Sequence, residues 1–310
     1  MSAISLLNET LQNKWSFETT MKIQDEMIPA MVEGKDIVAE SPTGSGKTLA
    51  YTLPILNKVD GNKKQTQALI VAPSQELAMQ IVEVIRDWTV GTDITVQQLI
   101  GGANSARQIE KLKKKPTIVV GTPGRLNELA RQGKLKLREI ETIVLDECDQ
   151  LLSREYRVVV KSFIENAAFG RQVVVVSATI TEEIKLVAER LMFEPVSIEI
   201  KPEDMVKFGK VVHSFVKVEE RDKTEMLRRL ANIEGLRGLA FVNNIDQVLM
   251  KQNKLEYRDA PIVALHSDMK KDERKKALDA FRKGEARILI ATDIAARGLD
   301  ISGLTHVIHV

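Results

Sequence analysis

The sequence predicts an α/β protein with two parallel-sheet domains, and three observations support this prediction. Short β-branched runs recur along the chain, and they are continuous rather than alternating, as strands buried on both faces are. Segments with helical periodicity lie between these runs, and such alternation implies a parallel sheet with right-handed crossovers. The 310 residues also exceed the length at which one hydrophobic core keeps growing. Two cores are therefore expected.

The strands of the first domain are expected within residues 1–200. They are predicted at 36–41, 67–73, 117–123, 142–147, 172–179 and 196–200. Amphipathic helices are expected between them, for example at 76–88 and 182–192. Residues 201–210 are polar, contain Pro202 and Gly209 and show no period, so they are predicted to be an interdomain linker.

A second domain is expected over residues 211–310. Its strands are predicted at 211–218, 238–242, 261–266, 286–293 and 305–310. This series stops on a strand, without a following helix to cover the sheet. The second domain is therefore expected to be incomplete.

The bulk composition excludes several classes of protein. The single cysteine, Cys148, rules out an intramolecular disulfide framework and a cysteine-based zinc site. No signal-peptide pattern opens the chain and no stretch approaches 18 apolar residues, so a cytoplasmic protein without a membrane partner is expected. A formal net charge of +2 leaves a nucleic-acid partner undecided.

The segment SPTGSGKT at residues 41–48 has the context of a phosphate-binding loop. It directly follows a predicted strand and precedes a helix-like stretch. Gly44 and Gly46 would let the backbone approach a phosphate, Lys47 would supply a cation and Thr48 a ligand for Mg²⁺. The alternative is a Gly-Ser loop with an incidental Gly-Lys-Thr, since Ser41 stands where the general pattern has glycine.

An acidic pair, Asp146 and Glu147, closes a predicted strand at the edge where ligands bind in open α/β sheets. The aspartate can hold Mg²⁺ through water while the glutamate orients an attacking water, as phosphoryl transfer requires. Solvated acids in a turn are the alternative for the pair alone. The phosphate loop and this spacing together favour the chemical interpretation.

These residues resemble the DEAD-box helicases of superfamily 2. Further segments match the family's motifs in order across residues 17–300. They are Phe17 and Gln24 in WSFETTMKIQ, APSQELAMQ (72–80), Gly101-Gly102, TPGR (122–125), DECD (146–149), SAT (177–179), FVNN (241–244), LHSDM (265–269) with Arg274 and Phe281, and ATDIAARGLD (291–300).

The resemblance implies a P-loop NTPase with two RecA-like domains that close on ATP and RNA together. An amide at Gln24 can read the edge of adenine and Phe17 can stack on it, which favours ATP over GTP. The implied nucleotide-binding residues are Phe17, Gln24, Ser41, Thr43, Gly44, Ser45, Gly46, Lys47, Thr48, Gly298 and Asp300. The implied catalytic residues are Lys47, Thr48, Asp146 and Glu147, with Asp149, Ser177 and Thr179 coupling the site to closure. The metal would be Mg²⁺ on Thr48 and Asp146.

The resemblance also implies a sequence-independent contact with RNA. The implied RNA-binding residues are Pro73, Gln75, Gly101, Gly102, Thr122, Gly124, Arg125 and Thr292. Backbone amides, hydroxyls and one guanidinium suit a reader of phosphate and sugar. The expected function is an ATP-dependent RNA helicase that unwinds local duplexes or remodels RNA–protein complexes, acting as a monomer.

Several features depart from the family's pattern. Gln75 replaces the customary arginine, which removes a bidentate donor and weakens the expected RNA contact. Cys148 replaces alanine and is expected to be a small buried filler, because adjacent anions disfavour its thiolate. No HRxGRxxR-like segment follows the last strand, so these 310 residues are expected to be impaired in turnover. A DNA-acting superfamily 2 motor and a non-catalytic RNA clamp or scaffold are the alternative functions.

Overall fold

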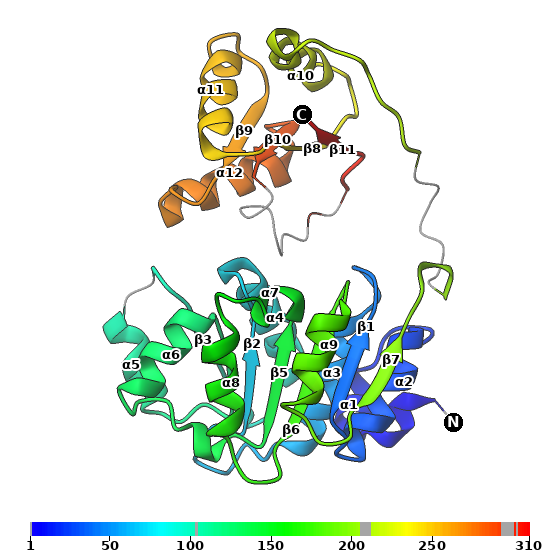
Figure 1. Cartoon of the computed structure of the whole chain (residues 1–310), viewed down its shortest axis with the longest axis vertical. Helices are drawn as coiled ribbons and strands as arrows, with labels where there is room; N and C mark the ends of the chain where they lie inside the picture. Colours follow the sequence, from blue (N-terminus) through cyan, green and yellow to red (C-terminus); the bar gives the residue numbers. More distant parts are fainter. Residues whose placement is uncertain (1, 103–104, 205–211, 293–300, 302) are drawn as a thin grey trace. The chain divides into compact units, whose positions relative to one another are not determined.

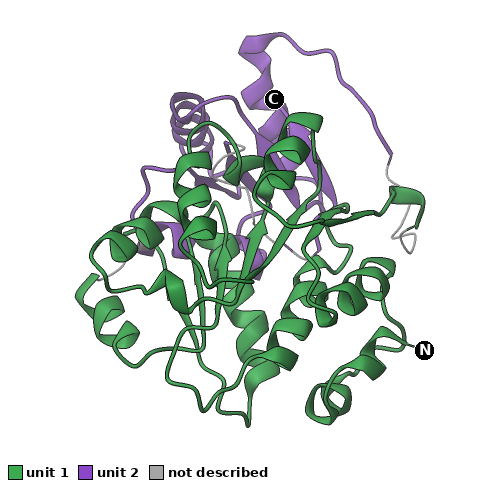
Figure 2. Cartoon of the chain, turned by 60° about the horizontal axis from the view of Figure 1, so that its bottom comes forward, with its two compact units in different colours: residues 1–210 green, residues 211–310 purple. Residues whose placement is uncertain are grey.

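Short parallel strands form the centre of both units of the chain in the computed structural model. The structure describes residues 2–102, 105–204, 212–292, 301 and 303–310. The chain divides into two units, residues 1–210 (unit 1) and 211–310 (unit 2), coloured green and purple in Figure 2. Each unit has its own sheet, which confirms the predicted fold class.

Unit 1 is built on seven parallel strands in the order β3-β4-β2-β5-β6-β1-β7 (Figure 1). The strands are β1 (Ile37–Glu40), β2 (Ala68–Val71), β3 (Val96–Leu99), β4 (Ile118–Gly121), β5 (Thr142–Asp146), β6 (Gln172–Ser177) and β7 (Val196–Glu199). Successive side chains of a strand face opposite sides, so Ile70 joins one hydrophobic core while Leu69 and Val71 join the other. Burial on both faces explains why the strands read as unbroken apolar runs.

Helices cover both faces of this sheet. They are η1 (Ala3–Leu6), α1 (Glu9–Lys14), α2 (Lys22–Val32), α3 (Lys47–Lys58), α4 (Gln75–Thr89), α5 (Ser105–Leu112), α6 (Pro123–Arg131), η2 (Leu137–Glu139), α7 (Cys148–Leu151), α8 (Arg157–Glu165), α9 (Glu182–Glu189) and η3 (Pro202–Asp204). Buried residues of η1 and α1 to α4 pack with Ile70 on one face, and those of α5 to α9 pack with Leu69 on the other.

The helix α4 shows how local sequence sets these elements. Its start is capped by Ser74, whose side chain accepts a hydrogen bond from the Leu77 N–H. Its buried residues Ile81, Val82 and Ile85 recur at helical spacing and lie on one face. The predicted helix over 76–88 is thereby confirmed.

Unit 2 is a smaller version of the same architecture. Its four parallel strands, in the order β11-β8-β10-β9, are β8 (Gly238–Phe241), β9 (Ile262–Leu265), β10 (Ile288–Ala291) and β11 (His306–His309). Its helices are η4 (Glu220–Asp222), α10 (Lys223–Ala231), α11 (Ile245–Glu256) and α12 (Lys271–Lys283). Among the described residues of both units, no helix is both long enough and apolar enough to span a bilayer.

One strand prediction was wrong, and one strand was not predicted. The strand predicted at 211–218 is absent from its described part, residues 212–218, where Phe215 is 94% exposed and no neighbouring strand pairs with the backbone. An apolar run becomes a strand only where a partner accepts its hydrogen bonds. The strand β3 was missed because Gln97 and Gln98 interrupt its apolar pattern.

Candidate functional site

Apart from Phe17 and Gln24, which precede β1, the candidate residues of unit 1 lie at or just after the carboxyl ends of six strands, and the strand order divides them into two sets. The nucleotide candidates follow β5, β6 and β1, which are neighbours in the sheet. The RNA candidates follow β3, β4 and β2, which are also neighbours. We call these the β5–β6–β1 edge and the β3–β4–β2 edge. They meet between β2 and β5.

The phosphate-loop segment leaves β1 and leads into α3. Gly44 and Gly46 both adopt left-handed backbone conformations, with φ of 78° and 88°. A Cβ on Gly46 would lie 2.6 Å from Nε2 of Gln24, so any other residue there would displace that amide besides adopting a backbone conformation that favours glycine. The loop therefore has the glycine geometry that close approach of a phosphate requires.

Lys47 turns its ammonium back onto this loop. Its Nζ donates to the carbonyl oxygens of Ser41 (2.6 Å) and Pro42 (2.9 Å). Burial lowers the pKa of Lys47, and the negative charges of Asp146, Glu147 and Asp149 oppose this shift.

Among the residues that the structure describes, the buried hydroxyls of Ser41 and Ser45 have no hydrogen-bond partner. An anion with several acceptor oxygens would satisfy buried donors of this kind, because unpaired polar groups in such positions are costly. Thr43 in the same loop is exposed to solvent. The donor set of this loop fits a phosphate group.

Gln24 and Phe17 lie on the amino-terminal side of the phosphate loop. The Gln24 side chain is buried, accepts from the Met21 N–H (2.9 Å) and donates to the Gly46 carbonyl (3.4 Å). Phe17 is 53% exposed and its ring meets Trp15 edge-on, with centroids 5.0 Å apart. The structure thus brings Gln24 directly onto the phosphate loop.

The acidic pair lies at the end of the central strand β5. Asp146 is buried, with Oδ1 accepting from the Glu147 N–H (2.9 Å) and Oδ2 accepting from the Tyr51 hydroxyl (2.8 Å). Burial raises the pKa of the Asp146 carboxyl, while the Tyr51 hydrogen bond and the charge of Lys47 oppose the rise. Sequence reasoning missed Tyr51, although it follows Lys47 by one helical turn.

Glu147 has a left-handed backbone, with φ and ψ both 54°, which is uncommon outside glycine. Its carboxylate accepts from the Gln150 side chain at 2.8 Å. Backbone strain of this kind clusters at active sites, although Glu194 and Asp259 of this chain have a positive φ as well. The following residue, Cys148, is completely buried, as predicted, and burial raises the pKa of its thiol.

Ser177 connects three parts of the β5–β6–β1 edge. Its hydroxyl donates to Oδ1 of Asp149 (2.8 Å), and its carbonyl accepts from the Ser41 N–H at the start of the phosphate loop (2.9 Å). Its hydroxyl also accepts from the Thr179 N–H (3.4 Å). The predicted coupling residues are therefore bonded to one another and to both sides of the site.

The donor set at Asp146 and Thr48 consists of oxygens, which a hard cation such as Mg²⁺ prefers. Among the residues that the structure describes, no three His, Cys, Asp or Glu side chains gather in a way that could hold a metal ion. A cation on Asp146 and Thr48 would therefore take its other ligands from phosphate and water, which is how Mg²⁺ is usually bound.

On the β3–β4–β2 edge, Gln75 begins α4 next to the glycine pair. Its Nε2 lies 3.7 Å from where a Cβ of Gly101 would be and 4.0 Å from that of Gly102. Pro73 precedes this helix and is half-buried. Thr122 is the residue before α6, and its N–H donates to the Leu99 carbonyl at the end of β3 (3.1 Å). A Cβ on Gly124 would meet no atom within 4 Å.

Arg125 is more deeply placed than its predicted RNA contact suggests, with 7% of its surface exposed. Its guanidinium donates to Oε1 of Gln108 (3.3 Å) and to Oγ of Ser105 (2.7 Å), and it pairs with Glu128. Gln108 in turn donates to the carbonyl of Ile100, directly before the glycine pair (2.9 Å). The guanidinium is thus engaged with the protein itself.

Of the three candidates in unit 2, Thr292 lies among the residues that the structure describes. Thr292 follows β10 and is buried. Gly298 and Asp300 lie outside the described residues.

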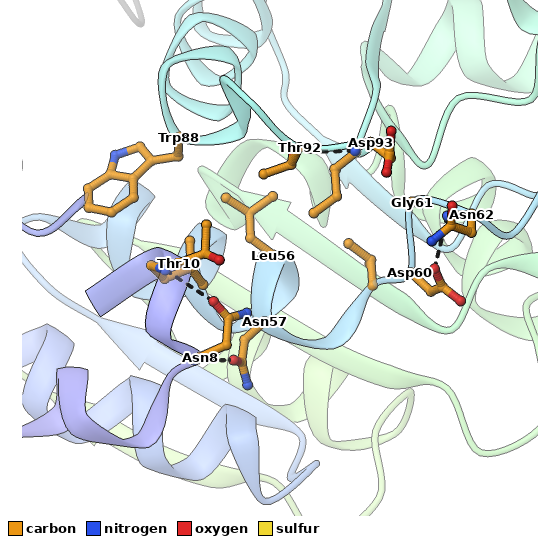
Figure 3. A pocket seen from close by; sticks show the side chains of 13 residues that line it. Asn8, Thr10, Leu56, Asn57, Asp60, Gly61, Asn62, Trp88, Thr92 and Asp93 are labelled. Carbon is orange, nitrogen blue, oxygen red and sulfur yellow. Dashed lines mark hydrogen bonds between the residues drawn. The ribbon is translucent and has the colours of Figure 1, made fainter. Parts of the chain in front are cut away.

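A hollow in unit 1 lies away from all these candidates (Figure 3). Its walls include Asn8, Asn57, Asp60, Trp88 and Asp93, and the Asn8 N–H donates to Oδ1 of Asn57 at 2.8 Å. The loops that form it follow α3 and α4 and precede β2 and β3, so it belongs to the amino edge of the sheet. Ligands of open parallel sheets bind at the opposite edge.

A phosphate loop after β1 and an acid at the end of β5, on one edge of a parallel sheet, define the class of P-loop proteins. The model of the DEAD/DEAH box helicase family matches residues 21–187, and that of the helicase conserved C-terminal domain matches residues 222–310. This chain belongs to the DEAD/DEAH box helicase family.

Relatives of the chain agree with this assignment. A probable ATP-dependent RNA helicase of Bacillus subtilis, YfmL, is 44% identical over 302 residues, which are 96% of this chain and 80% of that protein. The DEAD-box ATP-dependent RNA helicase CshC of Bacillus cereus is 42% identical over 302 residues, covering 96% and 77%. The structure of S. cerevisiae Dbp5 bound to RNA and ADP BeF3 matches with a TM-score of 0.84 and 27% identity, covering 99% of this chain and 79% of that one.

Proposed function

We propose that this chain is the core of an ATP-dependent RNA helicase, which couples ATP hydrolysis to local RNA duplex unwinding or to remodelling of RNA–protein complexes. The proposal rests on the arrangement of the candidates along the carboxyl ends of the strands of one sheet. The nucleotide candidates lie at the β5–β6–β1 edge, and the RNA candidates lie at the adjacent β3–β4–β2 edge. The names of YfmL and CshC, and the RNA and ADP BeF3 bound to Dbp5, support the same function.

The β5–β6–β1 edge is proposed to bind and hydrolyse ATP. The backbone of Gly44 to Thr48 and the Lys47 ammonium would hold the phosphates, with Gln24 and Phe17 on the adenine. Glu147 would orient the attacking water, and its own left-handed backbone conformation next to Asp146 supports that role. The Ser177–Asp149 hydrogen bond would couple this edge to the rest of the protein.

Asp146 and Thr48 are proposed to hold Mg²⁺, partly through water. Mg²⁺ bound there would neutralise charge on the transferred phosphoryl group. The residues of this chain would fix the carboxylate, which the burial of Asp146 and the hydrogen bonds that it accepts from Tyr51 and Glu147 support. In the second domain, Gly298 and Asp300 are proposed to meet the ribose and phosphates.

The β3–β4–β2 edge is proposed to bind the RNA backbone without regard to sequence. Pro73, Gln75, Gly101, Gly102, Thr122, Gly124 and Arg125 are the proposed contacts, with Thr292 from the second domain. Contacts of this kind reach phosphate and sugar, and contacts to the 2′-hydroxyl distinguish RNA from DNA.

The domain boundaries are also proposed. Residues 1–200 would form the ATP-binding domain, 201–210 the linker and 211–310 the helicase C-terminal domain, and the division of the chain at residue 210 supports this. We further propose a cytoplasmic monomer that works on ribonucleoprotein complexes, because one buried cysteine suits a reducing compartment.

Turnover by a polypeptide of these 310 residues alone is proposed to be slow. The family's HRxGRxxR-like segment is not among the printed residues. Arginines that stabilise a transferred phosphoryl group are worth ~10³-fold or more in rate. Comparison with a version extended by that segment would test this, and equal RNA-stimulated rates would contradict it.

ATP hydrolysis measured with and without single-stranded RNA tests the proposed function, with Glu147→Gln as the matched variant. RNA is expected to stimulate hydrolysis, and Glu147→Gln is expected to reduce it about 10²-fold or more while ATP binding persists, since the amide cannot accept a proton. Equal rates with and without RNA, or an unaffected Glu147→Gln variant, would overturn the catalytic assignment.

The hydrolysis assay, together with a measurement of RNA binding, tests the two alternative functions. A DNA strand of matching sequence that stimulates hydrolysis as well as RNA does would identify a DNA-acting motor. ATP-dependent RNA binding without hydrolysis, in the extended chain, would identify an RNA clamp or scaffold.

A further inference from the structure

A buried hydrogen bond joins the helix after the phosphate loop to the acid at the end of β5. The Tyr51 hydroxyl, on α3, donates to Oδ2 of Asp146 at 2.8 Å. Tyr51 is fully buried and Asp146 is 4% exposed. The two residues are 95 positions apart in the chain, so the bond exists only because α3 packs against the end of β5.

The hydroxyl of Tyr51 is not needed to fill space. The neighbouring fully buried positions of α3, such as Leu53 and Ile55, carry purely apolar side chains, and a phenyl ring would fill the Tyr51 position. Burying a hydroxyl without a partner costs about 1–3 kcal/mol. The hydrogen bonds of this hydroxyl to Asp146 and with Thr48 compensate for its burial, and the bond to Asp146 restrains the orientation of that carboxylate.

The two oxygens of Asp146 each receive one donor from a different direction. The Glu147 N–H donates to Oδ1 and the Tyr51 hydroxyl to Oδ2, at 2.9 Å and 2.8 Å. The terminal torsion of an aspartate is otherwise broad. Donors at both oxygens fix the plane of the carboxylate and leave its other lone pairs for a ligand.

We propose that Tyr51 is a positioning residue, whose hydroxyl holds the Asp146 carboxylate in the orientation that accepts Mg²⁺. This inference rests on the proposed function of Asp146. Partners that orient a metal ligand through a hydrogen bond typically account for a 10- to 100-fold difference in metal affinity. The Tyr51 hydroxyl also has a hydrogen bond with the side chain of Thr48, the residue of the phosphate loop that is proposed to hold the metal with Asp146. Nucleotide binding without metal depends instead on the other residues of that loop.

The variant Tyr51→Phe tests the inference, because it removes one oxygen atom and keeps the ring. Binding of a fluorescent ATP analogue is titrated against Mg²⁺ and, separately, in EDTA. The concentration of Mg²⁺ at half-effect is expected to rise about 10-fold or more in Tyr51→Phe. Affinity in EDTA is expected to stay as in the unmodified chain.

The matched control is Tyr156→Phe, which removes another hydroxyl of unit 1 that is hydrogen-bonded to a carboxylate, that of Glu155. A double-mutant cycle with Asp146→Asn gives a second readout, since the effects of mutations at two residues that act together are not additive. Tyr51→Phe is expected to have no further effect on the Mg²⁺ titration once Asp146 is replaced. Unfolding followed by tryptophan fluorescence checks that each variant is folded.

Three results would overturn the inference. In the first, Tyr51→Phe has the same Mg²⁺ titration as the unmodified chain. In the second, Tyr156→Phe weakens Mg²⁺ binding as much as Tyr51→Phe does. In the third, Tyr51→Phe weakens Mg²⁺ binding by the same factor in the Asp146→Asn background. In each of these cases the proposed function stands as long as nucleotide binding by the unmodified chain depends on Mg²⁺. If the unmodified chain binds nucleotide without any dependence on Mg²⁺, the metal role of Asp146 fails and this inference fails with it.

Discussion

Arg125 offers a decisive comparison between two roles, a contact to RNA phosphate and a support for the protein beneath the RNA. Its guanidinium donates to Gln108 through a buried bond of 3.3 Å and to Oγ of Ser105 at 2.7 Å. Its pair with Glu128 is weaker evidence of stability, because the Glu128 side chain is 47% exposed. The two hydrogen bonds therefore decide how much the free energy of unfolding changes when Arg125 is replaced.

Arg125→Ala is expected to lower the free energy of unfolding of unit 1 by about 2 to 3 kcal/mol. Each hydrogen bond to a charged donor contributes about 1.5 to 3 kcal/mol when buried, and the bond to the exposed Ser105 contributes less. Arg125→Lys is expected to cost about 1.5 kcal/mol or more, because an ammonium cannot reproduce the planar fork that meets Gln108, Ser105 and Glu128.

Urea unfolding followed by tryptophan fluorescence measures these changes. Both tryptophans, Trp15 and Trp88, lie in unit 1, so the signal reports that unit. A support role also predicts weaker RNA binding in Arg125→Lys with an unchanged dependence on salt. A direct phosphate contact predicts instead that Arg125→Lys binds normally and that Arg125→Ala reduces the salt slope by about 0.7. Unchanged stability of Arg125→Lys would refute the support role.

Two more predictions follow from local geometry. Gly46→Ala is expected to weaken ATP binding and stability, because its Cβ would lie 2.6 Å from Nε2 of Gln24 and its φ is 88°; equal ATP affinity would contradict this. In unit 2, a hydrogen bond from Arg228, with the charge of Arg258, lowers the pKa of Glu225 to about 2 from the ordinary 4.5. A lowered carboxyl pKa adds stability that is complete above the unfolded value and is lost as pH falls. Hydrogen exchange in α10 should therefore show that Glu225→Gln destabilises unit 2 at neutral pH, and that this difference shrinks between pH 4.5 and about 2. A difference that stays constant over that window would contradict the assignment.

Sequence patterns predicted much of the local structure and failed where a distant partner decides. The runs around Leu69 and Ile143 became strands because both of their faces are buried in unit 1. The run containing Phe215 is also rich in β-branched residues, yet no strand pairs with its described residues. Composition records a tendency to be buried, while pairing depends on which backbone lies alongside.

The candidate site shows the same division. Gly44, Lys47 and Asp146 were identifiable from residue type and spacing, because phosphate binding restricts the chemistry of a short segment. Tyr51 was not, since its bond to Asp146 joins positions 95 apart. Arg125 was predicted as an RNA contact from its motif, and its burial against Gln108 became visible only in three dimensions.

The sequence by itself determined the α/β class, the alternation of strands and helices and the residues able to bind phosphate and hold a cation. These depend on local spacing, on side-chain chemistry and on the period of buried positions. The tertiary structure alone decided that β5, β6 and β1 are neighbours on one side of the sheet and β3, β4 and β2 on the other. The order of parallel strands is set by long-range packing of helices on both faces, which leaves no local signal, and that order separates the proposed ATP and RNA sites.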